Sequence, residues 1–319
     1  MNNTVLWLFI TSIVGTMIWG VVNVLKRHYL DPKKHNVHAD VVAVYMMSGM
    51  AISALFVQLM IYGWPKVDRE FWIPFAISTV INFWIQYWNI KALKLEDASI
   101  VVPLASTMPM MVIFTAWYMH GEWPTFWGRL GIVCIAMGAY ILGLKGKYRK
   151  LPLTLRRWLP RDRYRNERRI ILLYFNPWLR LFYSKGARMA LGSAYLGAFA
   201  INFDKTYVLH SSPSTATFSA YTVIVLAIFL WSNNIKKRWT GLDKLHGKKL
   251  FAIGLFFGLG CVLMNWSFQY GIVPYVGTLR RTQILWTVIL ASIFLNEKHG
   301  VVRTIGACII FIGTLLIAF

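Results

Sequence analysis

Two adjacent arginines, Arg280 and Arg281, stand inside an apolar stretch of the chain. A helix that began only after them would offer about 14 residues, or roughly 21 Å, to a bilayer core about 30 Å thick. The helix must therefore begin near Ile272, which places Arg280 roughly 12 Å along it. Guanidinium groups at this depth must face a cavity or a partner, and they bind phosphate and carboxylate in bidentate geometry. The pair predicts an anion-binding site, and an internal ion pair, for instance with Asp204, stays open as the alternative.

Further polar side chains inside apolar stretches are predicted to line the same pocket. Gln86 and Asn89 are three residues apart, so they share one helix face. Asn265 and Gln269 are four residues apart and share a face in the same way. The other predicted lining residues are Trp19, Asn23, Thr107, Asn202 and Thr282. For any one of these residues, a hydrogen bond between helices is the alternative role.

Carboxylates are scarce in the apolar stretches. Asp204 is the only one inside a predicted membrane span, and we expect it, with the neighbouring Lys205, to serve in ion coupling. Glu122 and Glu297 instead occupy short polar turns, where we expect them to cap the helices that follow.

The composition predicts that these residues are carried by membrane helices. The chain is 57% apolar and only 14% charged, and its apolar stretches are long enough to cross a bilayer. Backbone polar groups cannot stay unpaired in lipid, so the spans should be helical. We expect an all-α polytopic membrane protein with ten spans: Val5–Leu25, Val41–Tyr62, Phe71–Leu93, Ser99–His120, Thr125–Leu144, Met189–Leu209, Ser214–Ser232, Leu250–Tyr270, Ile272–Leu295 and Val301–Phe319.

A repeat divides the chain into two halves. When Ser99–Ile141 is shifted by 175 positions onto Pro274–Ile317, matching residues coincide, namely Thr107 with Thr282, Glu122 with Glu297, Gly131 with Gly306 and Gly138 with Gly313. We interpret the glycines as helix-packing positions. Five spans in each half is an odd number, so the halves should enter the membrane in opposite directions. The predicted units are residues 1–145, a basic amphipathic cytoplasmic loop at 146–187, and residues 188–319.

The motifs together identify a family resemblance. They are Trp19-Gly20 with Asn23 and Lys26; Ala92 and Ala98-Ser99 before Pro103 and Pro109; Gly121-Glu122 with Gly131 and Gly138; and Asn296-Glu297 with Gly306 and Gly313. In order and spacing the chain resembles the drug/metabolite transporter superfamily, specifically its EamA-type ten-helix carriers. The resemblance implies two inverted five-helix repeats around a central cavity. Two features depart from the pattern, because Ile284 replaces the proline of the first copy and the central loop is long and basic.

The positive charges lie mostly on one side of the predicted spans. Of the 34 Lys and Arg residues, 28 lie in or near loops that follow odd-numbered spans and 3 in or near loops that follow even-numbered ones. The positive-inside rule then predicts cytoplasmic odd loops and external termini. Carriers similar to this family usually have internal termini, so the two arguments conflict, and we follow the charges. Basic and aromatic residues in the loop at 145–188 predict contact with anionic lipids rather than nucleic acid.

These observations predict a secondary active transporter and no enzyme. Seven histidines fall at span ends or in loops, and three cysteines lack metal-ligand spacing, so no metal or cofactor is expected. The predicted substrate is a small anionic or phosphorylated metabolite, or the phosphate-bearing head group of a lipid-linked intermediate that the protein would flip. Alternatives are an exporter of neutral or aromatic compounds, or a membrane scaffold without transport. We expect the plasma (inner) membrane as its location, and the chain could form a homodimer.

Overall fold

A computed structural model describes residues 3–29, 39–96, 98–143, 177–179, 181–231, 244–295 and 301–318, and these residues contain helices and turns but no strand. The elements of the first half are α1 (Asn3–Tyr29), α2 (Ala39–Val57), η1 (Gln58–Tyr62), η2 (Arg69–Phe71), α3 (Trp72–Leu95), α4 (Ala98–Ala105), α5 (Met108–His120) and α6 (Phe126–Gly143). Those of the second half are α9 (Lys185–Leu209), α10 (Pro213–Trp231), α12 (Lys244–Trp266), η4 (Ser267–Gln269), α13 (Val273–Leu279), η5 (Arg280–Thr282), α14 (Gln283–Leu295) and α15 (Val301–Ile317).

The helices form one bundle whose outer surface is apolar. Within the described residues, four helical stretches are long and apolar enough to cross a membrane, Asn3–Leu25, Val44–Tyr62, Ile100–His120 and Gly247–Gln269, and three further apolar helices are shorter. Large apolar side chains such as Ile73, Phe114 and Ile293 are exposed, which is typical of a surface that faces lipid. Each of the ten predicted spans coincides with helical structure where it is described, but the number of membrane crossings stays a prediction.

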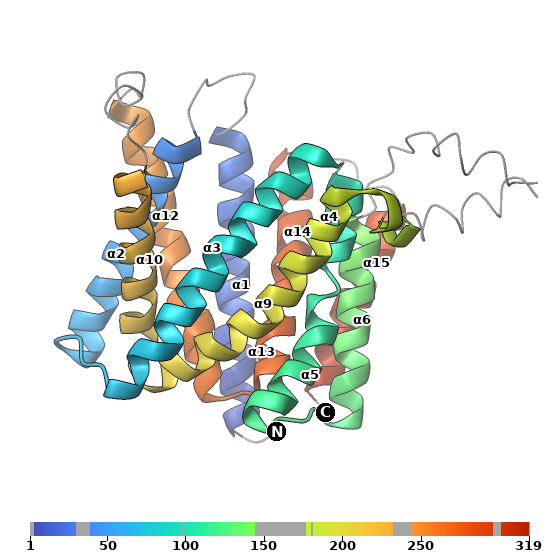
Figure 1. Cartoon of the computed structure of the whole chain (residues 1–319), viewed down its shortest axis with the longest axis horizontal. Helices are drawn as coiled ribbons and strands as arrows, with labels where there is room; N and C mark the ends of the chain where they lie inside the picture. Colours follow the sequence, from blue (N-terminus) through green and yellow to red (C-terminus); the bar gives the residue numbers. More distant parts are fainter. Residues whose placement is uncertain are drawn as a thin grey trace, which may run out of the picture.

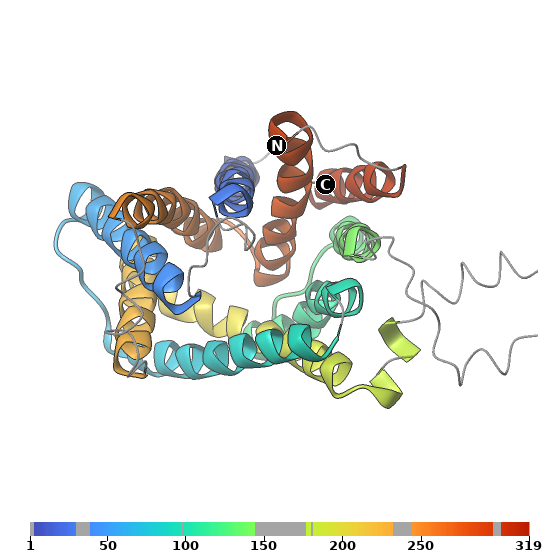
Figure 2. The ribbon, with the colours of Figure 1, turned by 90° about the horizontal axis from the view of Figure 1, so that it is seen from above.

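The two halves interleave and run in opposite directions. Helix α1 starts at the end of the bundle that carries both termini, whereas α9 starts at the other end and runs back (Figure 1). Helix α1 of the first half packs against α12 and α14 of the second, and α9 of the second half packs against α3, α4 and α5 of the first (Figure 2). Each half therefore inserts its first helix into the other half, as a two-fold relation between inverted repeats requires.

Glycines allow the last helices of the two halves to cross closely. A Cβ atom on Gly131 of α6 would lie 2.6 Å from the carbonyl oxygen of Gly313 in α15. A Cβ atom on Gly138 would lie 2.7 Å from the carbonyl oxygen of Gly306. No side chain fits at these separations, so the prediction that these repeated glycines serve helix packing is confirmed.

Both repeats interrupt a helix at the same position. The first break separates Ala105 from Met108, and the shift of 175 places Ala105 on Arg280, where η5 interrupts the second helix. Pro109 has no N–H, so in the first repeat the carbonyl of Ala105 loses its usual helical donor. Ile284 stands at that place in the second repeat, and the helix there tightens into a 3-10 turn instead of stopping.

Candidate functional site

A cavity of about 220 Å³ lies where the two helix breaks meet α3 and α9. Its polar lining residues are Asn82, Asn89, Ser193, Asp204, Arg280 and Arg281. Its remaining lining residues are small or apolar, namely Ile85, Ala105, Met108, Ala194, Gly197, Ala200 and Ile201. Both predicted arginines thus face a cavity, as their depth in the helix requires.

Arg280 is held by a carboxylate, an amide and an aromatic ring. Its Nη1 lies 3.7 Å from Oδ2 of Asp204, and its Nη2 donates to Oδ1 of Asn265 at 3.3 Å. The guanidinium carbon also lies 5.0 Å from the centre of the Phe268 ring, within range of a cation–π contact. Asn265 in turn donates to Thr217 at 2.9 Å, so this predicted lining residue orients Arg280 from outside the cavity.

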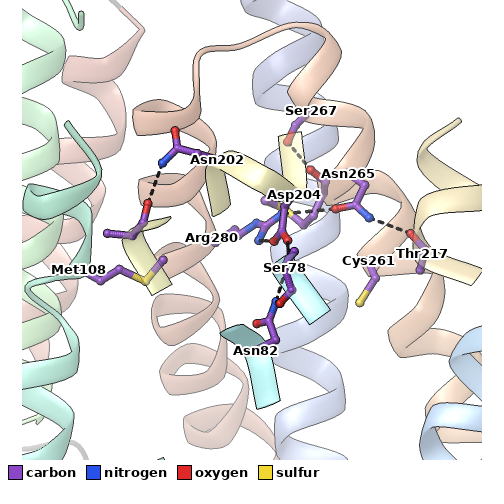
Figure 3. Close-up of polar contacts among 12 residues, drawn as sticks. Ser78, Asn82, Met108, Asn202, Asp204, Thr217, Cys261, Asn265, Ser267 and Arg280 are labelled. Atoms are coloured by element: carbon purple, nitrogen blue, oxygen red, sulfur yellow. Dashed lines mark hydrogen bonds and ion pairs between the residues drawn. The ribbon is translucent and has the colours of Figure 1, made fainter. Parts of the chain in front are cut away.

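Asp204 has a partner at each of its carboxylate oxygens. Ser78 donates to its Oδ1 at 2.5 Å, while Arg280 faces its Oδ2. Asn82 donates to the Ser78 hydroxyl at 3.0 Å and extends the network along α3 (Figure 3). The internal ion pair that the sequence left open therefore exists for Arg280.

Arg281 differs from Arg280 in lacking such a partner. Its Nη2 donates to the sulfur of Met108 at 3.1 Å and to the carbonyl oxygen of Ala105 at 3.4 Å. Among the described residues, no carboxylate lies within ion-pair distance of Arg281. One positive charge therefore faces the cavity without a counter-ion in the part of the chain that the structure describes.

A polar row on α3 supplies the opposite wall. Asn89 accepts a hydrogen bond from Ser193 of α9 at 2.7 Å. Ser78 and Asn82 precede it on the same helix face at intervals of four and seven residues, and sequence reasoning missed both. Their spacing from Asn89 could have predicted that both residues share its helix face. The predicted Gln86 lies in α3, but its side chain is outside the described residues.

Comparison with known proteins decides the family. The model of the EamA-like transporter family matches residues 5–144 and 184–319, which together are most of the chain. The chain belongs to this family. A solved structure named only "Crystal structure of protein" is similar with a TM-score of 0.67 and 11% identity, over 97% of this chain and 97% of its own. That likeness shows the fold alone. No curated protein matches.

Family membership makes the chain an integral, multi-pass membrane protein of the drug/metabolite transporter type. The members of this family are transporters, which agrees with the expectation that the chain is no enzyme. Among the described residues of the transporter, no group of His, Cys, Asp and Glu could hold a metal ion.

Three predicted lining residues join helices of the transporter instead. Asn202 is fully buried and donates to Thr115 of α5 at 3.0 Å, apart from the arginine site (Figure 3). Asn23 of α1 donates to Thr287 of α14 at 3.3 Å. Thr282 shares a 2.9 Å hydrogen bond with Thr16 of α1. None of the three lines the described cavity.

Three other predicted lining residues also lie outside the described cavity. Trp19 packs its ring 5.6 Å from that of Phe257. Thr107 donates to the carbonyl of Leu104 at 2.7 Å within the first helix break. Gln269 is exposed at the end of η4.

Lys205 follows Asp204 in sequence but serves a different part of the transporter. It forms an ion pair with Glu122, which also accepts a hydrogen bond from the backbone N–H of Val273 at 2.7 Å. Glu122 thus caps α13, so the prediction that it caps the following helix was wrong. Thr125 performs that task for α6 by accepting from the N–H of Gly128 at 3.0 Å.

Several predictions fall on residues that the structure does not describe. The side chain of Lys26, all of Glu297 and most of the loop at 145–188 are among them, including the predicted contact with anionic lipids.

Proposed function

We propose that this chain is a secondary active transporter that binds a small anionic solute through Arg281 and carries it by alternating access across ten spans arranged as two inverted repeats. The observation that carries the proposal is the position of Arg281. Among the described residues, its guanidinium has only a thioether and a carbonyl as hydrogen-bond partners where it faces the cavity. An arginine at this depth without a counter-ion favours an anionic ligand that completes its coordination.

The cavity favours a small solute over a drug-sized one. Its volume of about 220 Å³ is below the roughly 300–1,000 Å³ that is common for sites of drug-sized ligands. Asn82, Asn89 and Ser193 add amide and hydroxyl groups around the anion. These groups suit a solute whose remaining atoms are also polar, such as a carboxylated or phosphorylated metabolite.

A head group on a lipid-linked intermediate would present the same chemistry. Its phosphate would bind Arg281 as a free phosphate ester does, while its chain stayed in the bilayer. We favour the free solute because the described lining is mainly polar or small rather than a long apolar channel.

Thermal-shift measurements on the purified transporter test the proposal. We expect inorganic phosphate and small carboxylates to raise the midpoint of unfolding, and uncharged N-acetyl amino-acid amides to leave it unchanged. Arg281→Gln should abolish the anion effect yet fold normally, because Arg281 forms no ion pair among the described residues. Arg129→Gln is the matched control, since Arg129 lies over Trp123 and Phe126, and is not among the residues lining the cavity.

Two results would overturn the proposal in part or in full. Stabilisation by neutral aromatic compounds but by no anion would support the exporter of neutral metabolites. Stabilisation by polyprenyl phosphate in nanodiscs, without any effect of soluble anions, would support the lipid-linked substrate. Uptake of the stabilising anion into proteoliposomes then separates transport from binding alone.

A further inference from the structure

The charges around the cavity do not balance. Of the described residues that line it, only Arg280, Arg281 and Asp204 carry formal charge, which gives a net charge of +1. The neighbouring Lys205 does not alter this sum, because Glu122 pairs with it. All other lining residues are uncharged.

Asp204 forms an ion pair with Arg280, so its negative charge offsets the positive charge of Arg280. Ser78 donates to one carboxylate oxygen, and the Arg280 guanidinium lies 3.7 Å from the other, so Asp204 is the counter-ion of Arg280. Asn265 and Phe268 also hold Arg280 in place. The pair of Asp204 and Arg280 therefore contributes no net charge, and Arg281 alone attracts the solute.

Unbalanced charge is expensive where water is excluded. A solute with one negative charge would neutralise the site. A dianion would leave one excess negative charge facing Asp204, and a neutral solute would leave Arg281 unpaired. We infer that Asp204 determines the charge specificity of the transporter, because by neutralising Arg280 it restricts the cavity to solutes with a single net negative charge. This inference rests on the proposed function, since it assumes that the cavity binds the transported anion.

Three probes of nearly the same shape separate the effect of charge from that of size. Dimethyl sulfone, methanesulfonate and sulfate each place four substituents around one sulfur atom and carry charges of about 0, −1 and −2 across the usable pH range. Isothermal titration calorimetry on the purified, full-length transporter gives their dissociation constants. For the wild type we expect methanesulfonate to bind at least about tenfold more tightly than sulfate, and dimethyl sulfone to show no binding.

Variants then change the charge sum of the lining. Asp204→Asn raises the sum to +2 and should reverse the preference toward sulfate by at least about tenfold. The double variant Asp204→Asn with Arg280→Gln returns the sum to +1 and should recover the preference for methanesulfonate. Asp68→Asn makes the same chemical change at an exposed site and should leave the ratio unchanged. If Asp204→Asn fails to fold, the wild type and the double variant still test the inference, because loss of the preference for methanesulfonate in either protein would contradict it.

The outcomes distinguish this inference from the proposed function. Binding of sulfate as tight as that of methanesulfonate in the wild type, or a preference for sulfate in the double variant, would overturn the role of Asp204 while leaving an anion transporter. Absence of binding by both anions, with all variants folded, would overturn the proposed function and this inference with it.

Discussion

Arg281 donates to the carbonyl oxygen of Ala105 at 3.4 Å, so a side chain of the second repeat satisfies a backbone group of the first. Pro109 causes this arrangement, because a residue with an N–H at that position would donate to the same carbonyl within a continuous helix. The second repeat has Ile284 there and keeps its helix connected through η5. The difference between Pro109 and Ile284 therefore shapes the site. It leaves the carbonyl of Ala105 without its usual helical donor, beside the guanidinium of Arg281.

Pro109→Ala tests whether the break matters for the site. The new N–H should pair with Ala105 and straighten the helix, which removes a partner that positions Arg281. We expect the affinity for methanesulfonate to fall roughly tenfold, the effect of one hydrogen bond to a charged group. Thermal stability should change little, because Pro109 lies in the first turn of α5, a position where proline is tolerated.

Pro103→Ala is the control for that variant, because Pro103 lies inside α4 rather than at the break. It should leave the affinity for methanesulfonate within about twofold of the wild type, since it adds no donor for Ala105. An unchanged affinity in Pro109→Ala would show that Arg281 does not depend on the break.

Part of this site could be predicted from the sequence, and part could not. The length of a membrane helix placed Arg280 and Arg281 inside the bilayer, and the scarcity of carboxylates singled out Asp204. Sequence spacing does not reveal which neighbour a helix face contacts. Asn202 and Asp204 are two residues apart, about 200° around the helix, so one contacts α5 and the other the cavity.

The fold, too, could be predicted only in part from the sequence. Apolar stretches and the repeat predicted the helices and their pairing into halves, and the repeated glycines predicted a close crossing. The exchange of first helices between the halves is set by packing across the bundle, which no local pattern records. Glu122 shows the consequence, because its partners Lys205 and Val273 are distant in sequence.

The ion pair between Lys205 and Glu122 should stabilise the bundle where α5, α9 and α13 meet. Both side chains are nearly buried, 12% and 14% exposed, so removing one partner leaves a charge without compensation. We expect Glu122→Gln to lower the free energy of unfolding by roughly 3 kcal/mol, as for other buried pairs that lose one member.

A second substitution separates the ion pair from the cap on α13. Adding Lys205→Met to Glu122→Gln removes the unpaired charge and should recover more than half of the lost stability, measured by thermal unfolding in detergent. Equal destabilisation in the single and double variants would mean that the bond from Val273, and not the pair with Lys205, carries the effect.

The crossing of α6 and α15 should not tolerate a larger residue at Gly131. A methyl group there would approach the carbonyl of Gly313, so Gly131→Ala should destabilise the transporter by roughly 1–3 kcal/mol. Cys308→Val is the control, since it adds bulk on the exposed face of α15 and should change the midpoint of unfolding little. Equal midpoints for wild type and Gly131→Ala would show that the helices can separate at this point.

The last prediction concerns orientation. Both termini and the turn that contains Asp68 lie at one end of the bundle, and α6 ends at the other (Figure 1). Since 28 of the 34 basic residues lie in or near loops that follow odd-numbered predicted spans, and α1 and α6 end at this second end, we expect it to face the cytoplasm. In a variant without Cys134, Cys261 and Cys308, an impermeant maleimide should label Asp68→Cys in intact cells. It should label Arg165→Cys, in the basic loop, only after permeabilisation. Labelling of the loop in intact cells would show that the orientation is the opposite one, and that the charge distribution does not determine it.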